Sequence, residues 1–354
     1  MNIVIAGAGI AGGYLARLLG QKGIDADIYD PMDHATRCGY RSCGWGAPAG
    51  IGAYLDTIGL DLDDYLFKRM PWMNFDGLRA RTPLCTFDKT RLIRDFLDGS
   101  GMVRADIGEA GLDGYDVVVD ATGICRAFLP PCRSDLTLPT LQDRVVVEST
   151  GEERLGPGVY GNMVPGLGYI WVFPLGGDQY HIGIGGIGLS THKNLLDRFY
   201  RDQSGRFSFS RVCTCTGSVR VASPYYSTPF FTGGAGNNGR TQAVVGVGES
   251  IGTVSPFTGE GIVFSMECAK MLADSWPDFE GYSRRVLSGF SWMKKERETL
   301  DYLLEQKGRN GPRIRDRWRF YRNARRSGIG LPMLDAFKRI GTLSRWVDTR
   351  DLEQ

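Results

Sequence analysis

Residues 2–12 read NIVIAGAGIAG, a short apolar run followed by three glycines in the spacing Gly7-x-Gly9-x-x-Gly12. The uninterrupted apolar run predicts a buried parallel strand, and apolar residues that recur at helical spacing from Tyr14 to Leu19 predict a helix directly after the glycines. A second strand is predicted over residues 26–29, and it ends at Asp30. A strand, a glycine turn, a helix and a strand that ends in an acid indicate a Rossmann-type α/β unit.

Each conspicuous residue of this unit has a physical role in binding a dinucleotide. Gly7 permits the tight turn, Gly9 lets the backbone approach a pyrophosphate, and Gly12 allows close packing of helix and strand. The positive end of the helix then faces the phosphates, and Asp30 is expected to accept hydrogen bonds from the adenosine ribose. The alternative, a glycine turn without a ligand, does not account for the complete arrangement.

Two later segments repeat the pattern of a buried strand that leads into a polar turn. Residues 115–119 predict a strand that continues into Asp120-Ala-Thr-Gly123, which is either a second nucleotide contact or a simple strand end. Residues 243–247 predict another strand, followed by Gly248-Glu249 and by a helix near 260–273. Between these elements we expect a loop over 31–52 and a helix over 89–98.

The pattern changes between about residues 140 and 232, where short apolar runs alternate with Gly and Pro. Such alternation is typical of an antiparallel sheet, and the residues after 273 are helical and basic in character. The sequence therefore predicts a discontinuous nucleotide-binding domain (1–65, 86–130 and 240–278), an inserted antiparallel-sheet substrate domain (66–85 and 131–239) and a helical C-terminal region (279–354).

Composition excludes several classes of protein. With 354 residues, 42% hydrophobic and 23% charged, the chain is neither disordered nor a coiled coil, and its net charge of +2 gives no nucleic-acid signature. The longest uncharged stretch, 155–177, is broken by seven Gly and three Pro, so a membrane-spanning helix is not expected. Eight cysteines without a C-x-x-C pair and only three histidines argue against a metal site, and reduced thiols in a cytoplasmic protein are the expectation.

The charge is unevenly distributed. Residues 281–354 hold 18 Lys and Arg against 9 Asp and Glu, and the segment 307–326 contains nine basic residues, one acid and three aromatic residues. A solvated helix face is one explanation, and peripheral contact with an anionic membrane at the inner face of the cell is the other. Nucleic-acid binding is disfavoured because no recognition fold accompanies the charge.

Three features together resemble one family, the FAD-dependent geranylgeranyl reductases, which include the archaeal digeranylgeranylglycerophospholipid reductases. They are Ser255-Pro-Phe-Thr-Gly-Glu-Gly261, the aromatic run Tyr169-Ile-Trp-Val-Phe-Pro174, and Cys43-Gly44 after the second strand. The resemblance implies an α/β fold: a glutathione-reductase-like FAD domain with an inserted p-hydroxybenzoate-hydroxylase-like antiparallel sheet. It also implies FAD contacts at Gly7, Gly9, Ala11, Gly12, Asp30, Cys43, Gly44, Gly46, Arg91 (with Lys89 as the competing alignment), Gly123, Glu249, Gly261 and Ile262.

Cys43 and the aromatic run are the candidates for chemistry and for substrate binding. A thiol between glycines belongs to no apolar face, so Cys43 is either an inert loop thiol or a group beside the flavin that donates a proton or shapes the pocket. Tyr169, Trp171 and Phe173 alternate, so they share one face of a strand. That face is either plain core or the wall of an apolar tunnel for a polyprenyl chain.

The resemblance implies a reductase that saturates double bonds of a polyprenyl lipid with a hydride from reduced FAD. Because no second strand–GxGxxG–helix unit is present, we expect no dedicated nicotinamide domain. The electron donor is then transiently bound NAD(P)H or a small protein such as a ferredoxin. Two alternatives stay open: an FAD-dependent monooxygenase or halogenase of the same fold, and a flavin-binding electron carrier.

Overall fold

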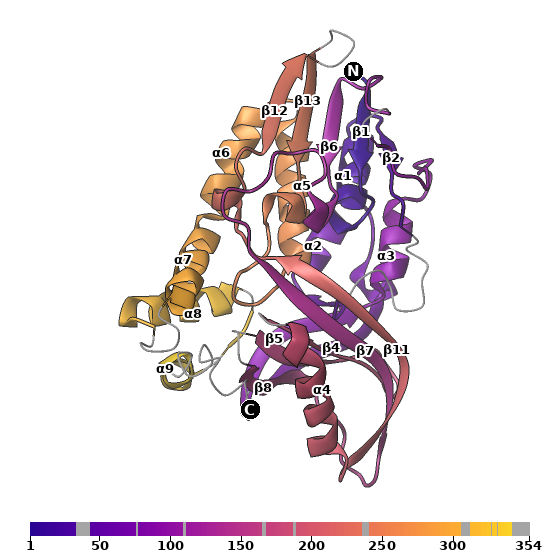
Figure 1. Ribbon diagram of the computed structural model, residues 1–354. Helices are drawn as coiled ribbons and strands as arrows, with labels where there is room; N and C mark the ends of the chain where they lie inside the picture. Colours follow the sequence, from indigo (N-terminus) through magenta and orange to yellow (C-terminus); the bar gives the residue numbers. More distant parts are fainter. Residues whose placement is uncertain are drawn as a thin grey trace.

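The computed structural model describes residues 1–32, 43–75, 77–108, 111–164, 168–186, 189–235, 241–305, 312–326, 328–330 and 332–341. Two β-sheets and a set of C-terminal helices make up most of these residues (Figure 1). The α/β fold expected from the sequence is confirmed.

The first sheet has five strands in the order β12-β13-β6-β1-β2. Its four parallel strands are β1 (Ile3–Ala6), β2 (Asp27–Tyr29), β6 (Val117–Asp120) and β13 (Thr241–Gly246), and the antiparallel edge strand is β12 (Phe231–Ala235). Helices α1 (Ile10–Gln21), α2 (Ile51–Asp56), α3 (Lys89–Phe96) and α5 (Ile262–Ser275) share its hydrophobic core, together with residues of α6 (Phe279–Gly289) and α7 (Ser291–Glu305). Strand β1 (IVIA) and the first three residues of β6 (VVV) are continuous apolar runs, as expected of parallel strands that are buried on both faces.

The second sheet has eight strands in the order β11-β7-β10-β9-β8-β4-β5-β3. Its strands are β3 (Gly46–Pro48), β4 (Leu66–Phe75), β5 (Leu78–Phe87), β7 (Thr137–Ser149), β8 (Gly158–Val164), β9 (Gly168–Pro174), β10 (Gln179–Gly185) and β11 (Phe207–Arg220). Neighbours pair antiparallel except β4 and β8. One face packs Ile170, Val172 and Ile182 with Leu196 and Phe199 of α4 (Leu189–Gln203) in a separate core. The opposite face carries Tyr169, Trp171 and Phe173, because side chains alternate along β9.

The C-terminal region is helical, as the sequence predicts. It contains α6 (Phe279–Gly289), α7 (Ser291–Glu305), α8 (Ile314–Arg326) and α9 (Met333–Gly341). Residues of α7, α8 and α9 pack against the β4–β5 hairpin, and Gly330 forms an antiparallel bridge with Arg81 of β5. The tail is therefore attached to the second sheet and next to its edge.

Three elements differ from the sequence-based expectation. The predicted loop 31–52 contains β3, which pairs with β5 of the eight-stranded sheet, and the start of α2. Phe231–Ala235 lies in the segment assigned to the inserted sheet, but it pairs with β13 of the five-stranded sheet. Helix α4 interrupts the segment that was expected to contain strands only.

None of the helices in the described ranges is long and apolar enough to cross a membrane. Likewise, no group of three or more His, Cys, Asp and Glu side chains in the described part of the chain is arranged to hold a metal ion.

Candidate functional site

The glycine turn between β1 and α1 is held by close backbone contacts. Gly7 has a φ of 101°, and its amide donates to the carbonyl oxygen of Tyr29 at 2.7 Å. A Cβ atom on Gly12 would lie 1.9 Å from the carbonyl oxygen of Gly7. Gly7 and Gly12 are therefore needed for the turn itself, because any side chain on Gly12 would push the helix away from it.

Gly9 has a different role. It precedes α1 with extended backbone angles, and no side chain caps the helix N-terminus. A Cβ atom on Gly9 would meet no atom within 4 Å, because Gly9, Ile10 and Ala11 border an open cavity. The first amides of α1 thus face this cavity without a capping side chain, which is the arrangement that binds an anion at a helix N-terminus.

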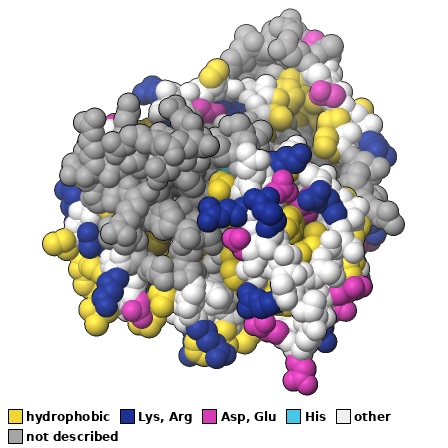
Figure 2. All heavy atoms as spheres, turned by 60° about the horizontal axis from the view of Figure 1, so that its bottom comes forward, with side chains coloured by type: hydrophobic (Ala, Val, Ile, Leu, Met, Phe, Trp, Pro, Cys, Tyr) yellow, Lys and Arg dark blue, Asp and Glu magenta, His cyan; other side chains and the backbone are white. Residues whose placement is uncertain are grey.

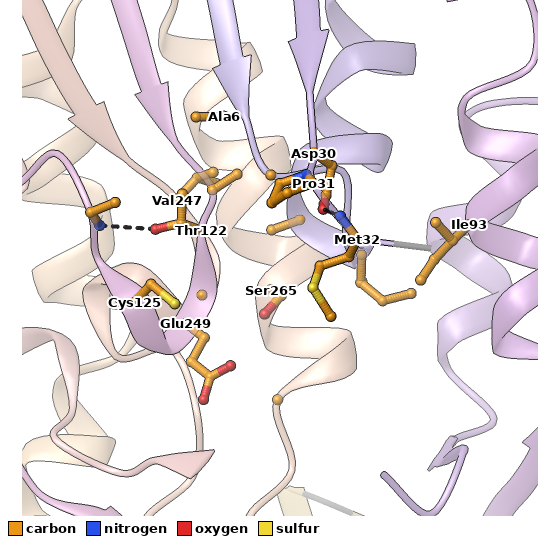
Figure 3. Close-up of a pocket in the computed structure, with 18 of the residues that line it drawn as sticks. Ala6, Asp30, Pro31, Met32, Ile93, Thr122, Cys125, Val247, Glu249 and Ser265 are labelled. Carbon is orange, nitrogen blue, oxygen red and sulfur yellow. Dashed lines mark hydrogen bonds between the residues drawn. The ribbon is translucent and has the colours of Figure 1, made fainter. Parts of the chain in front are cut away.

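Asp30 lies at the end of β2, where the sequence places it, and it is 3% exposed. Its carboxylate accepts hydrogen bonds from the amides of Ala8 (2.6 Å) and Met32 (2.8 Å), the second of which is drawn in Figure 3. Asp30 therefore ties the glycine turn to the end of β2 while it also lines the cavity. Its contact with a ribose stays a prediction.

The end of β6 supplies the second wall of the cavity. Asp120 is fully buried, and its carboxylate accepts hydrogen bonds from the amides of Thr122 (3.1 Å), Phe128 (2.9 Å) and Leu129 (3.2 Å). These bonds fold the segment after β6 back on itself and place Gly123 against the cavity. The motif is thus more than a strand end, because its acid organises the turn that lines the cavity.

The third wall comes from β13 and the start of α5. Gly248 has a φ of 72°, and a Cβ atom there would lie 2.6 Å from that of Ala11. The next residue, Glu249, lines the cavity and accepts a hydrogen bond from the Arg220 amide at 2.8 Å. Gly261 and Ile262 border the same cavity at the N-terminus of α5 (Figure 3 labels Glu249 and Ser265 on this side).

Glu260 lies between the cavity-lining Gly259 and Gly261 and is not itself a lining residue, and sequence reasoning did not select it. Its carboxylate accepts a hydrogen bond from the Val263 amide at 3.1 Å, so it caps α5. Burial raises the pKa of the Glu260 carboxyl to about 7, although this amide and the charge of Lys89 act in the opposite direction. The acid within Gly259-Glu-Gly261 was a signal in the sequence, since an acid three residues before a helical amide is a common cap.

The structure distinguishes between the two candidates for the basic residue on α3, Lys89 and Arg91. Lys89 lines the cavity, whereas Arg91 is not among its lining residues. The Arg91 guanidinium donates to the carbonyl oxygen of Asp64 at 2.8 Å and lies 5.3 Å from the centre of the Tyr65 ring. Lys89, and not Arg91, therefore lines the cavity, and contact of a basic residue with a phosphate stays a prediction.

These segments enclose one cavity of about 370 Å³ between the carboxyl ends of the five-stranded sheet and the second sheet. Ser218 and Val219 of β11 contribute from the second sheet. This is where ligands bind in open parallel α/β sheets, and the volume lies within the usual range of small-molecule sites.

Cys43 lines the cavity as a free thiol, and the glycines that follow it pack on the aromatic face of β9. A Cβ atom on Gly44 would lie 2.3 Å from the Phe173 ring, and one on Gly46 would lie 3.4 Å from it. Phe173 therefore lies directly under the loop that carries Cys43. The Tyr169 hydroxyl donates to the Thr258 carbonyl, which belongs to the loop leading to Gly261.

Other residues fix this aromatic face. Trp171 is 7% exposed, and its indole donates to the Gln142 side chain at 3.0 Å. Trp45 lies edge-to-face with His181, with ring centres 4.8 Å apart. Burial, aided by the charge of Arg144, lowers the pKa of His181 to about 3, so this imidazole is neutral at physiological pH.

The expectation that all thiols are reduced is wrong at one position. Cys213 on β11 is disulfide-bonded, whereas Cys43, Cys85, Cys125, Cys132, Cys215 and Cys268 are not in disulfides. Cys38 lies outside the described residues.

Comparisons with known proteins place this geometry among flavoproteins, although no family model matches the chain. The chain is 24% identical over 319 residues to an uncharacterized protein of Methanocaldococcus jannaschii, covering 77% of this chain and 82% of that protein. It is 30% identical over 155 residues to digeranylgeranylglycerophospholipid reductase 2 of Methanothermobacter thermautotrophicus. That match spans 41% of this chain and about a third (36%) of the relative's length.

A geranylgeranyl bacteriochlorophyll reductase-like protein from Thermoplasma acidophilum has a similar structure, with a TM-score of 0.64 and 18% identity over 85% of this chain and 90% of that one. The chain has the fold of the FAD-dependent, geranylgeranyl-reductase-like flavoproteins. A probable FAD-dependent monooxygenase from Pseudomonas aeruginosa shares this fold, with a TM-score of 0.56 and 17% identity over 85% of this chain and 96% of the other. The fold expected from the sequence is thus confirmed, and proteins that share it are described as FAD-dependent or flavin-dependent.

Proposed function

We propose that the protein binds FAD in this cavity and uses the reduced flavin to saturate double bonds of a polyprenyl lipid. The observation that carries the proposal is the contact between the loop that begins at Cys43, which lines the cavity, and the aromatic face of β9. Tyr169, Trp171 and Phe173 are not themselves among the residues that line the cavity, and their contact with a substrate stays a prediction. An apolar face next to a dinucleotide site favours a long hydrocarbon substrate over a compact polar one.

The residues present fit FAD. The open space beside Gly9 and the uncapped N-terminus of α1 suit a pyrophosphate, and Lys89 offers a positive charge at the same cavity. Asp30 and Glu249 both line the cavity, and carboxylate oxygens are suitable acceptors for ribose and ribityl hydroxyls.

Reduced flavin supplies a hydride to one alkene carbon, and a proton must reach the other carbon. Cys43 and Cys125 both line the cavity, and we assign the proton to the Sγ of Cys43 because its loop contacts the aromatic face of β9. His181 is a poor candidate because its lowered pKa keeps the ring neutral. An isolated alkene offers no polar group to activate, so the remaining work of the protein is to position the chain and to exclude water with Trp171 and Phe173.

The monooxygenase and halogenase alternative rests on the shared fold alone, and the electron carrier alternative requires no substrate. NAD(P)H or a ferredoxin stays our proposal for the electron donor. Parallel samples of the purified, anaerobically reduced protein separate the three functions. Cofactor extraction with mass spectrometry first identifies FAD. The reduced protein is then mixed with a geranylgeranyl lipid alone, with the lipid and oxygen, or with an oxidised protein acceptor.

We expect the flavin to be reoxidised without oxygen and the lipid to gain two mass units for each double bond reduced. Substrate-dependent oxygen consumption with an oxygenated or halogenated product would replace the proposal by the first alternative. Reoxidation by a protein acceptor, with no lipid product, would replace it by the second.

A further inference from the structure

The outer face of helix α8 combines exposed hydrophobic side chains with arginines. Ile314 is 72% exposed and Trp318 is 45% exposed. These two residues are one turn apart, so they lie on the same side of the helix. The first turns of α9 add Met333 (45% exposed) and Leu334 (71% exposed), and the two helices contact each other through the rings of Trp318 and Phe337, 5.2 Å apart.

The exposed charges on the outer side of α8 are positive. Arg315, Arg322 and Arg325 are exposed and flank the stripe of Ile314 and Trp318 at helical spacing, and Arg315 also lies 3.7 Å from the Asp316 carboxylate. Asp316, the acid of α8, is 4% exposed on the opposite side, where Arg319 holds it at 3.2 Å. The exposed side of α8 is therefore both cationic and apolar.

We propose that this surface, formed by Ile314, Arg315, Trp318, Arg322 and Arg325 of α8 with Met333 and Leu334 of α9, docks the protein on an anionic membrane. Arginines that flank a tryptophan and aliphatic side chains suit a bilayer surface: the apolar groups enter the acyl boundary and the guanidinium groups contact lipid phosphates. Figure 2 brings forward the end of the molecule with the second sheet, where Lys and Arg side chains lie among hydrophobic ones.

Helix α8 separates the docking surface, on its outer side, from a segment that forms part of the cavity wall. On the inner side of α8, Phe320 stacks on Phe257, with ring centres 4.6 Å apart. Phe257 belongs to the segment 254–261, which supplies Val254, Gly259 and Gly261 to the cavity wall. The surface thus places the site next to the bilayer in which a long-chain lipid is dissolved. This last step rests on the proposed function, whereas the membrane contact does not.

The test measures co-sedimentation of the whole protein with phosphatidylcholine vesicles. The vesicles contain either no anionic lipid or roughly 30 mol% phosphatidylglycerol, which gives their surface a negative charge. Ile314→Ser/Leu334→Ser removes exposed apolar groups, and Arg322→Gln/Arg325→Gln removes exposed charge. The matched control is Leu287→Ser/Arg284→Gln on α6, where both side chains are also exposed.

We expect the unchanged protein to bind the anionic vesicles at least about tenfold more tightly than the neutral ones. The arginine pair should weaken binding about fivefold for each residue, with a smaller salt dependence. The apolar pair should weaken it at least about tenfold, and the α6 control should bind like the unchanged protein. Equal binding to both vesicles, or unchanged binding in both α8–α9 variants, would overturn the proposal. Concentration-dependent self-association abolished by the apolar pair, without vesicle binding, would instead assign the surface to a second copy of the chain.

A second readout separates this inference from the proposed function. Docking variants should retain flavin and turn over a short, water-soluble prenyl substrate, while they lose turnover of a lipid embedded in vesicles. Vesicle binding without turnover of any prenyl substrate would leave the docking surface in place and remove the proposed function.

Discussion

The open space beside Gly9 gives the sharpest test of the cofactor site. In Gly9→Ala the new methyl group fits the backbone, because φ is −74° and no atom lies within 4 Å of the added Cβ. The free energy of unfolding should therefore change by less than about 0.5 kcal/mol. The methyl group would occupy the space through which a pyrophosphate reaches the first amides of α1.

The loss of flavin affinity can be scaled from those amides. A hydrogen bond to a charged group contributes about 1.5–3 kcal/mol, so the loss of one such bond raises the Kd of FAD roughly tenfold to a hundredfold. Two glycines of the same helix serve as controls. Gly12→Ala should destabilise the fold by at least about 1–3 kcal/mol, since its Cβ would lie 1.9 Å from the Gly7 oxygen. Gly20→Ala should be neutral or stabilising by up to about 1 kcal/mol, because its Cβ meets no atom within 4 Å.

Urea unfolding of the flavin-free proteins and titration with FAD, followed by flavin fluorescence, give the two quantities separately. The expected pattern is loss of affinity without loss of stability in Gly9→Ala and loss of stability in Gly12→Ala. Unchanged FAD affinity in Gly9→Ala would show that the α1 N-terminus does not hold the pyrophosphate, whatever the other variants do.

Two further changes test other parts of the site, and a third tests Glu296, a buried acid of α7 that accepts a hydrogen bond from the Ser255 hydroxyl at 2.8 Å. Lys89→Met should raise the Kd of FAD at least about fivefold, the equivalent of about 1 kcal/mol, whereas Arg91→Met should leave it unchanged; the reverse result would restore the original alignment. Cys43→Ala should keep FAD bound but lower turnover at least about tenfold, which corresponds to about 1.4 kcal/mol of activation free energy. Turnover of Cys43→Ser should be intermediate if Cys43 donates a proton. Equal turnover in both variants and the unchanged protein would make Cys43 a loop residue without a role in catalysis. Burial raises the pKa of Glu296 from 4.5 to about 7, so the folded state holds a proton that the unfolded chain releases between these values, and stability should fall as pH rises through this window, by up to about 1.4 kcal/mol per unit. Urea unfolding at pH 5 to 8 should show that stability depends less on pH in Glu296→Gln than in the unchanged protein, but not in the exposed control Glu280→Gln. The same pH dependence in all three proteins would contradict a raised pKa of Glu296.

The parts of the site that were predictable from the sequence depend on local geometry. The glycine spacing fixes a turn between adjacent elements, so Gly7, Gly9 and Gly12 lie where the motif places them. The alternation of Tyr169, Trp171 and Phe173 likewise follows from the pleat of a strand, and the three rings do share a face.

The parts that were missed depend on orientation or on pairing between distant segments. Lys89 and Arg91 are two residues apart and point to nearly opposite sides of α3, so a shift in the alignment exchanges their roles. Gly46–Pro48 is too short and too rich in Gly and Pro to signal a strand, and it forms β3 only because β5 offers an edge. The glycines of Phe231–Ala235 likewise gave no strand signal in the sequence, and this segment forms β12 because it pairs with β13.

Glycine also explains how the aromatic face is held in place. A Cβ atom on Gly183 would lie 2.3 Å from the Trp171 ring, and one on Gly44 would lie 2.3 Å from the Phe173 ring. Both rings therefore occupy volume that any side chain at these positions would fill, one against β10 and the other against the Cys43 loop. Because a ring fitted into such a space has no freedom to turn, the distance between the apolar wall and the Cys43 loop is set by the backbone. The 49 glycines of the chain are thus informative beyond turns: at these two positions the lack of a side chain leaves room for Trp171 and Phe173, and a larger residue at either would displace the ring that it faces.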